Sequence, residues 1–138
     1  MSRHVLKRLS PGDLIAAVVA RVSQETGLVC TTNPNDEESP FFAVSFVGSR
    51  PGKSKALRLD VYSLQLHAIS KPSYTQAEVL ELIGLLEEAM EKDIALPCPF
   101  SLVRQDEMGV LTVKRDPTGE WHAIVLYELT VSYGLMIK

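Results

Sequence analysis

The sequence predicts an α+β fold in which two amphipathic helices pack on one face of a mainly antiparallel sheet of four to six strands. Two segments combine helix-capping residues with apolar side chains at helical spacing. The other segments show strand-like patterns of apolar residues, and a turn motif near residue 118 joins two of them. The predicted order is helix, two or three strands, helix, then a strand and a long hairpin.

The most informative element is the strand predicted over residues 121–133. The sequence Asp-Pro-Thr-Gly at residues 116–119 has the composition of a tight turn, and the apolar residues 110–113 precede it as a strand. Alternate residues of a strand face the same side, so the long strand presents one aromatic-rich face. The residues on that face are Trp121, Ala123, Val125, Tyr127, Leu129, Val131 and Tyr133. We expect this strand to be the spine of the sheet and to pack against both helices.

The first helix is predicted to begin after Ser10. Ser10 suits the N-cap, Pro11 the first helical position and Asp13 the third, where its charge also complements the helix dipole. Gly27 provides a natural end in the left-handed conformation. The apolar stripe between them consists of Leu14, Ile15, Val18, Val19 and Val22.

The second helix is predicted from Thr75 to about residue 90 or 91. Thr75 and Glu78 have the spacing of a capping box, and Pro97 and Pro99 prevent the helix from continuing. The expected buried face consists of Val79, Leu80, Leu82, Ile83, Leu86 and Met90.

Three strands are predicted between the helices. Residues 28–31 should form a short edge strand, and the apolar residues 41–47 a strand that is covered on both faces or lies centrally. Residues 56–68 alternate, but their apolar positions change phase near residues 62–63, which predicts a bulge or a change of partner there. Residues 48–55 are predicted to be a polar, basic loop.

The length and composition predict one domain over residues 1–138 of an ordinary soluble protein, with 46% hydrophobic and 22% charged residues. The net charge of −3 argues against recognition of nucleic-acid sequence, and no apolar run reaches the roughly 18 residues that a membrane span requires. A secretion signal is not apparent, so we expect a cytoplasmic chain in which Cys30 and Cys98 are reduced.

Catalytic motifs are absent from the sequence. His4, His67 and His122 have no partner at metal-ligand spacing, and the two cysteines form no cluster, so we expect ordinary solvated or half-buried histidines. Residues 48–54 end in Gly-Lys-Ser but are one residue too short between the glycines for a phosphate loop. We therefore expect no cofactor, no metal and no enzymatic activity.

Several features are not explained by folding alone. They are the polar loops on both sides of residues 41–47, the basic arm at residues 3–8 and the apolar residues 135–137. Ordinary loops and frayed ends explain each feature separately, but together they suit a small protein that contacts other subunits.

The layout resembles the phage tail terminator family, the lambda-like minor tail proteins. The matching features are a first helix ending at Glu-Thr-Gly (residues 25–27), a Pro-initiated apolar strand at residues 39–44, a long strand, and a second helix. The chain then continues with Arg-Asp-Pro-Thr-Gly-Glu-Trp at residues 115–121 and a strand with alternating Tyr127 and Tyr133. The sequence departs from the family pattern in its basic residues 48–55 and in running on to residue 138.

This resemblance implies a structural protein of a tailed phage or prophage, assembled in the cytoplasm and retained in the virion tail. It implies a ring, usually hexameric, that caps the tail tube, stops its elongation and provides the surface for head joining. The implied partners are other copies of the chain, the tail tube protein and the head–tail connector protein. The alternative is a small acidic secretion-type chaperone, which works as a dimer and holds an unfolded segment.

The predicted contact residues are basic side chains on an otherwise acidic chain. A hairpin needs no cluster of positive charges, and an acidic surface on a neighbouring subunit or on the tube would use them. The residues that we predict to bind partners are Arg50, Lys53, Lys55, Arg3, Lys7 and Arg8.

Overall fold

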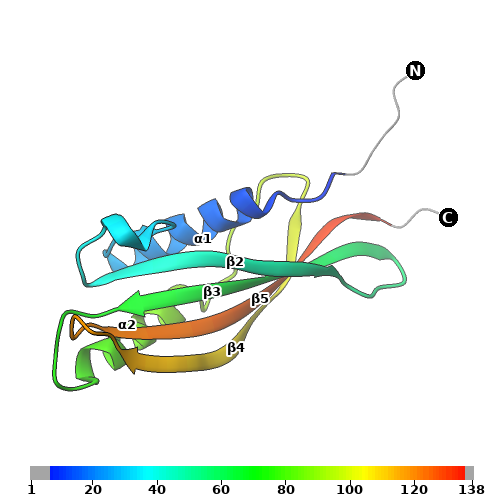
Figure 1. Ribbon diagram of the computed structural model, residues 1–138. Coiled ribbons are helices and arrows are strands. Elements are labelled where there is room, and N and C mark those ends of the chain that lie inside the picture. The colour runs from blue at the N-terminus through cyan, green and yellow to red at the C-terminus, as the bar shows by residue number, and fades with distance from the viewer. Residues whose placement is uncertain (1–6, 136–138) are drawn as a thin grey trace.

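The computed structural model describes residues 7–135 of the chain (Figure 1). The predicted apolar C-terminal residues 136–137 lie outside that range, as do Arg3 and His4. The elements in chain order are α1 (Pro11–Thr26), β1 (Cys30–Thr31), the 3-10 turn η1 (Pro34–Asp36), β2 (Phe41–Pro51), β3 (Leu57–Ile69), α2 (Ala77–Ala89), β4 (Ser101–Arg115) and β5 (Trp121–Leu135).

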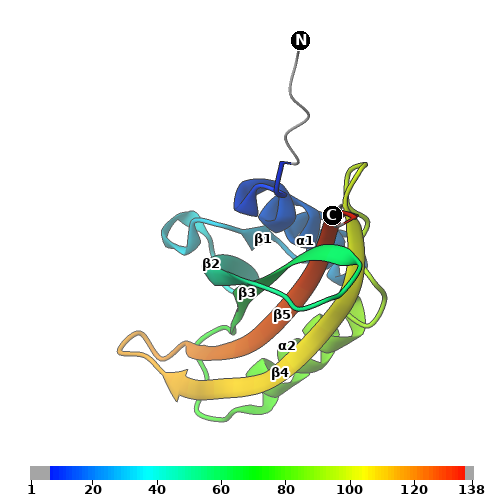
Figure 2. The same cartoon turned by 90° about the vertical axis from the view of Figure 1, so that its right-hand side faces the viewer.

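The sheet has five strands in the order β1-β2-β3-β5-β4. β1 pairs with β2 in parallel over two residues, and the other three pairs are antiparallel. The strands curve strongly, as the turned view shows (Figure 2). Apolar residues of both helices and of alternate strand positions form the main core, which confirms the predicted fold class.

Helix α1 is confirmed at both ends. The Ser10 hydroxyl accepts a hydrogen bond from the backbone N–H of Gly12 at 3.2 Å, and Pro11 is the first helical residue. Gly27 has a φ of 73°, and its N–H donates to the carbonyl of Ser23. Residues other than glycine rarely adopt this left-handed backbone conformation, so Gly27 ends the helix with little strain.

The N-cap of helix α2 lies one residue later than the predicted Thr75, and the predicted capping box does not form. The Thr75 hydroxyl accepts only from the backbone N–H of Ala77, at 3.4 Å. The N-cap is Gln76, whose side chain makes no capping hydrogen bond. The Glu78 carboxylate instead accepts from the backbone N–H of Lys71, in the preceding loop. Leu80 was predicted to be buried but is 51% exposed, because it lies about 120° around the helix from the centre of the buried stripe.

Strand β2 differs from its prediction in length and burial. Phe41 to Val44 are buried on both faces, but Phe46 and Val47 are exposed. The strand also continues through Gly48 to Pro51, pairing with residues 60–63 of β3, so only residues 52–56 form the loop. The predicted loop at 48–55 is therefore half strand, because pairing with β3 overrides its polar sequence.

The predicted irregularity near residues 62–63 lies on the neighbouring strand. The register between β2 and β3 shifts at Val47, opposite Ser63 and Leu64, whereas β3 itself alternates without interruption there. Leu59 and Val61 face the side of the sheet away from the helices, and Tyr62 faces the core. The change of phase in the sequence thus arises because the apolar residues before Tyr62 face away from the helices and those after it face the core.

Strand β5 is the spine of the sheet, as predicted. It lies between β3 and β4, and its residues from Ala123 to Val131 are buried at every second position. The preceding turn is closed by the Asp116 carboxylate, which accepts from the backbone N–H groups of Thr118 at 2.9 Å and Glu120 at 3.1 Å. The predicted short strand at 110–113 is the last part of the 15-residue strand β4.

Candidate functional site

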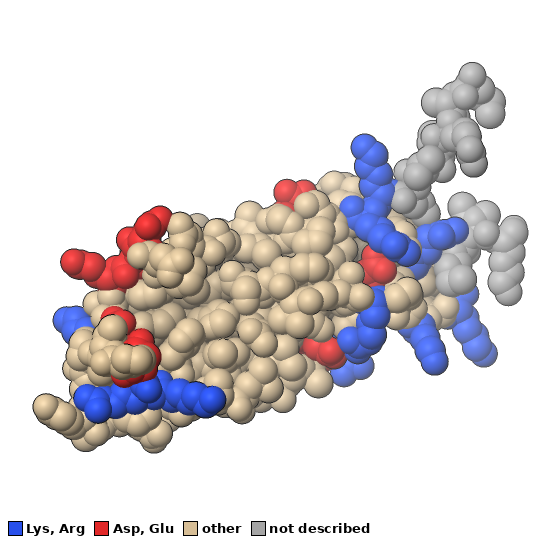
Figure 3. Space-filling model, in the orientation of Figure 1, with Lys and Arg blue, Asp and Glu red and all other residues tan. Residues whose placement is uncertain are grey.

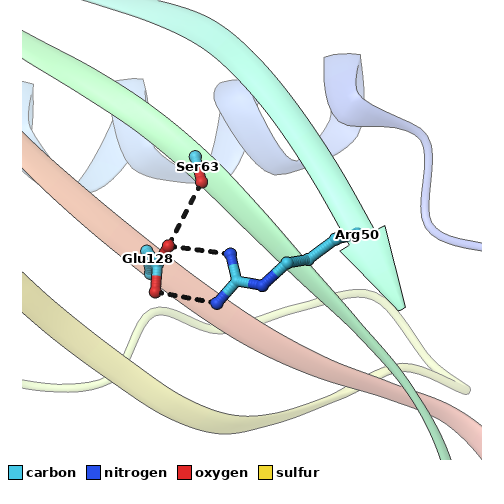
Figure 4. A network of polar contacts seen from close by, with 3 residues as sticks. All are labelled: Arg50, Ser63 and Glu128. Carbon is cyan, nitrogen blue, oxygen red and sulfur yellow. Dashed lines mark hydrogen bonds and ion pairs between the residues drawn. The ribbon is translucent and has the colours of Figure 1, made fainter. Parts of the chain in front are cut away.

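The predicted contact residue Arg50 forms part of a polar network across the face of the sheet away from the helices (Figure 4). Its guanidinium donates two hydrogen bonds to the Glu128 carboxylate, at 2.8 and 3.2 Å, and the Ser63 hydroxyl donates to the same carboxylate at 3.5 Å. The hydrogen bond with Arg50 lowers the pKa of Glu128. Arg50 therefore braces three strands, and is not the free loop cation that the sequence predicted.

Arg8 is also engaged within the subunit. Its Nε lies 3.2 Å from Oδ2 of the buried Asp60, an ion pair that lacks hydrogen-bond geometry, and its guanidinium lies 5.7 Å from the centre of the Tyr133 ring. A side-chain hydrogen bond with Tyr133, followed by the charge of Asp60, raises the pKa of Arg8. Next to it the Tyr62 hydroxyl donates to the carbonyl of Leu9 at 2.6 Å. These contacts fix the segment before α1 on the sheet.

The remaining described members of the predicted basic set are exposed. Lys7 precedes α1, while Lys53 and Lys55 lie in the loop that joins β2 and β3. The ion pairs found within residues 7–135 are Arg8–Asp60, Arg50–Glu128 and Arg104–Asp106, so none involves these three lysines. Figure 3 shows Lys and Arg side chains gathered at the end of the molecule where the β2–β3 hairpin projects.

An open groove of about 580 Å³ lies beside this hairpin, between β3 and β4. The Arg50–Glu128 pair forms part of its polar lining. Its apolar lining residues are Leu57, Leu59, Val61, Val103 and Met108. Its polar lining also includes Lys53, Arg104 and Asp106. A groove that combines apolar and charged lining residues suits contact with another macromolecule.

Strand β4 has an open outer edge along its described length and carries exposed apolar side chains. Its register with β5 shifts at three places, each of which adds one residue to β4. The extra residues are Val103, Met108 and Leu111, which are 43%, 52% and 53% exposed. The sequence pattern does not reveal them, because a bulge residue breaks the alternation that identifies a surface position.

His67 and His122 form a pair that the sequence analysis also missed. His67 Nδ1 lies 2.9 Å from His122 Nε2, and the Ser45 hydroxyl lies 3.1 Å from His67 Nε2. Burial first, and then the charge of His122, lowers the pKa of His67 to about 4. Burial likewise lowers the pKa of His122. Both are half-buried, as expected, but only the pairing of β3 with β5 brings them together.

Other chemistry is sparse in the described part of the chain. No group of three or more His, Cys, Asp or Glu residues there is placed to hold a metal ion. Cys30 and Cys98 are free, and burial raises the pKa of the Cys30 thiol to about 12. Neither described helix is long and apolar enough to cross a membrane.

Comparison with known proteins identifies the family. Residues 5–138 match the sequence profile of a phage tail terminator family whose description is "Putative tail termination protein". The chain belongs to this phage tail terminator family. The match covers the segments on which the resemblance was based, from the first helix to the tyrosines of the last strand, and confirms it.

The fold of this terminator also occurs in a solved virus-like particle. A chain from the "Virion of native gene transfer agent (GTA) particle" superimposes with a TM-score of 0.66, covering 88% of this chain and 96% of that chain at 14% identity. A search of curated proteins finds no significant match. The chain is thus a structural phage tail protein with an α+β fold.

Proposed function

We propose that this terminator forms a ring on the last ring of the tail tube, stops tube elongation and provides the surface to which the head connector binds. Membership of the tail terminator family is the observation that carries this proposal. Its partners are other copies of the chain, the tail tube protein and the head–tail connector protein. Assembly takes place in the cytoplasm, and the role is structural rather than enzymatic.

The presence of two different exposed surfaces on one chain supports a ring. A closed ring requires a heterologous contact, in which one patch of a subunit meets a different patch of the next. The chain offers two different surfaces for such a contact: the basic β2–β3 hairpin and the open edge of β4 with its exposed apolar residues. A dimeric chaperone would instead use one patch twice, so the number of subunits distinguishes the two functions.

The test is the mass and shape of the purified chain. Light scattering over a range of concentrations should show a multimer larger than a dimer, and electron microscopy should show annular particles. Adding tail tubes should place these particles at tube ends. A dimer that neither forms rings nor binds tube ends would contradict the proposal and favour the chaperone.

A further inference from the structure

The sheet has two open edges among the described residues. β1 pairs only with Phe42 and Ala43, so β2 from Val44 to Pro51 has no partner on its outer side. β4 has none along Ser101–Arg115. Proteins usually protect such edges with charges, prolines, bulges or covering loops, because an open edge attracts other chains.

These two edges are marked by exposed apolar residues at their bulges. The residue that the β2 bulge adds is Val47, which is 55% exposed, and the three that β4 adds are Val103, Met108 and Leu111. A bulge disrupts backbone pairing with another strand. A charged side chain at the bulge would in addition repel an apolar partner. The side chains here instead provide apolar contacts, which favours a specific partner at each edge.

Residues of opposite charge lie beside the two edges. The β2 edge leads directly into the loop that carries the exposed Lys53 and Lys55. Beside the β4 edge lies α2, held there by Gln105, whose side-chain amide donates to the carbonyl of Met90 at 2.7 Å. Two acidic residues at this junction are Glu87 of α2 and Glu107 of β4, and Arg21 of α1 lies near it with its guanidinium bound to the carbonyls of Lys92 and Asp93.

The side chains of Glu87 and Glu107 interact in the free subunit. A side-chain hydrogen bond with Glu107 raises the pKa of Glu87, and the Tyr127 hydroxyl donates to Glu107 at 3.2 Å. Two neighbouring carboxylates repel each other when both are charged, and an approaching ammonium group relieves that repulsion. This junction therefore suits a lysine-bearing segment.

We propose that the β2–β3 hairpin of one subunit docks against the β4 edge of the next, with Lys53 and Lys55 facing Glu87 and Glu107. The inference rests on the proposed ring and names its subunit contact. The occupant is a second copy because one chain carries both complementary sides on different edges, which is what a head-to-tail ring requires.

A charge swap tests the contact in the purified chain. Lys53→Glu with Lys55→Glu should raise the concentration needed for multimer formation at least tenfold, measured by light scattering. Adding Glu87→Lys and Glu107→Lys to the same chain should restore assembly, because every contact then carries the reversed pair. The matched control adds Glu37→Lys and Glu38→Lys instead, in the loop after η1; it has the same net charge and should not restore assembly.

Cross-linking provides a second measurement. Carbodiimide joins a lysine to a carboxylate only where the two touch, and mixing unlabelled with ¹⁵N-labelled chains identifies links between subunits. We expect intersubunit links from Lys53 or Lys55 to Glu87 or Glu107. Because Glu107 accepts the Tyr127 hydroxyl, Glu87→Lys with Glu88→Lys serves as the acidic-side variant if Glu107→Lys disturbs folding.

The outcomes separate the contact from the ring. Multimers that survive Lys53→Glu with Lys55→Glu, or that lack these cross-links, would overturn the contact and leave the ring intact. Rescue by the matched control as well as by the swap would show a general charge effect and also overturn it. A wild-type chain found only as a monomer or dimer would contradict both.

Discussion

Replacing Leu129 by alanine tests the core on which both proposals rest. Leu129 lies in the middle of β5 with no exposed surface, inside the cluster that joins the sheet to both helices. Its strand is paired on both sides, with β3 and with β4. The backbone around it is therefore held in place and cannot readily close over the space that a smaller side chain leaves.

The expected cost follows from this burial. Removing three carbon atoms from an apolar site loses about 2.4 kcal/mol at about 0.8 kcal/mol for each CH₂ group. The remaining cavity adds to this, so the free energy of unfolding should fall by about 3–4 kcal/mol, within the usual range of about 2–5 kcal/mol for such substitutions. For a domain of this size the melting temperature should fall by roughly 8–15 °C.

The matched control is Leu111→Ala in β4. Leu111 is 53% exposed, so the same change in side chain should alter the free energy of unfolding by no more than about 0.5 kcal/mol. Urea unfolding followed by circular dichroism measures both variants, at concentrations below those of multimer formation because Leu111 lies on the proposed subunit contact. Equal stability losses for Leu129→Ala and Leu111→Ala would refute the assignment of the buried face of the hairpin.

Three further predictions concern titratable groups. Folding lowers the pKa values of His67 and His122, so the unfolded chain binds more protons, and stability should fall as the pH drops from about 6.5 towards 4. The melting temperature of a His67→Gln/His122→Gln variant should fall less between pH 7 and pH 5 than that of the wild-type chain. A Cys30→Ser/Cys98→Ser variant should still assemble and keep most of its stability, and a wild-type multimer lost on adding reductant would contradict free thiols. Folding raises the pKa of Glu87, so the repulsion between the Glu87 and Glu107 carboxylates grows as the pH rises through that pKa. Glu87→Gln should therefore slightly raise the melting temperature of the free subunit at pH 7. A lower melting temperature would contradict the interaction with Glu107.

The elements with strong local signals could be predicted from the sequence. Helix α1 is defined by Ser10, Pro11 and Gly27 within one short segment, and β5 by a turn followed by uninterrupted alternation. These signals act between near neighbours in the chain, so they do not depend on the rest of the fold. The capping box of α2 failed because Glu78 found a competing donor in the preceding loop.

The contact surfaces depended on pairing between distant segments. Arg50 lies in a segment whose composition is typical of a loop. Only the extension of β2 along β3 places it over Glu128, 78 residues later. His67 and His122 meet for the same reason. The composition did identify Lys53 and Lys55 as cations without an evident structural use, and within the described residues they have no ion-pair partner.

Tail length in electron micrographs tests the central claim most directly. The comparison is between particles from the phage or prophage that carries this gene, the same strain with the gene deleted, and the deleted strain supplied with the wild-type chain. If the chain caps the tube, deletion should give tails of excessive and variable length that are not joined to heads, and the supplied chain should restore uniform tails on complete particles. Tails of normal length joined to heads in the deleted strain would contradict the account.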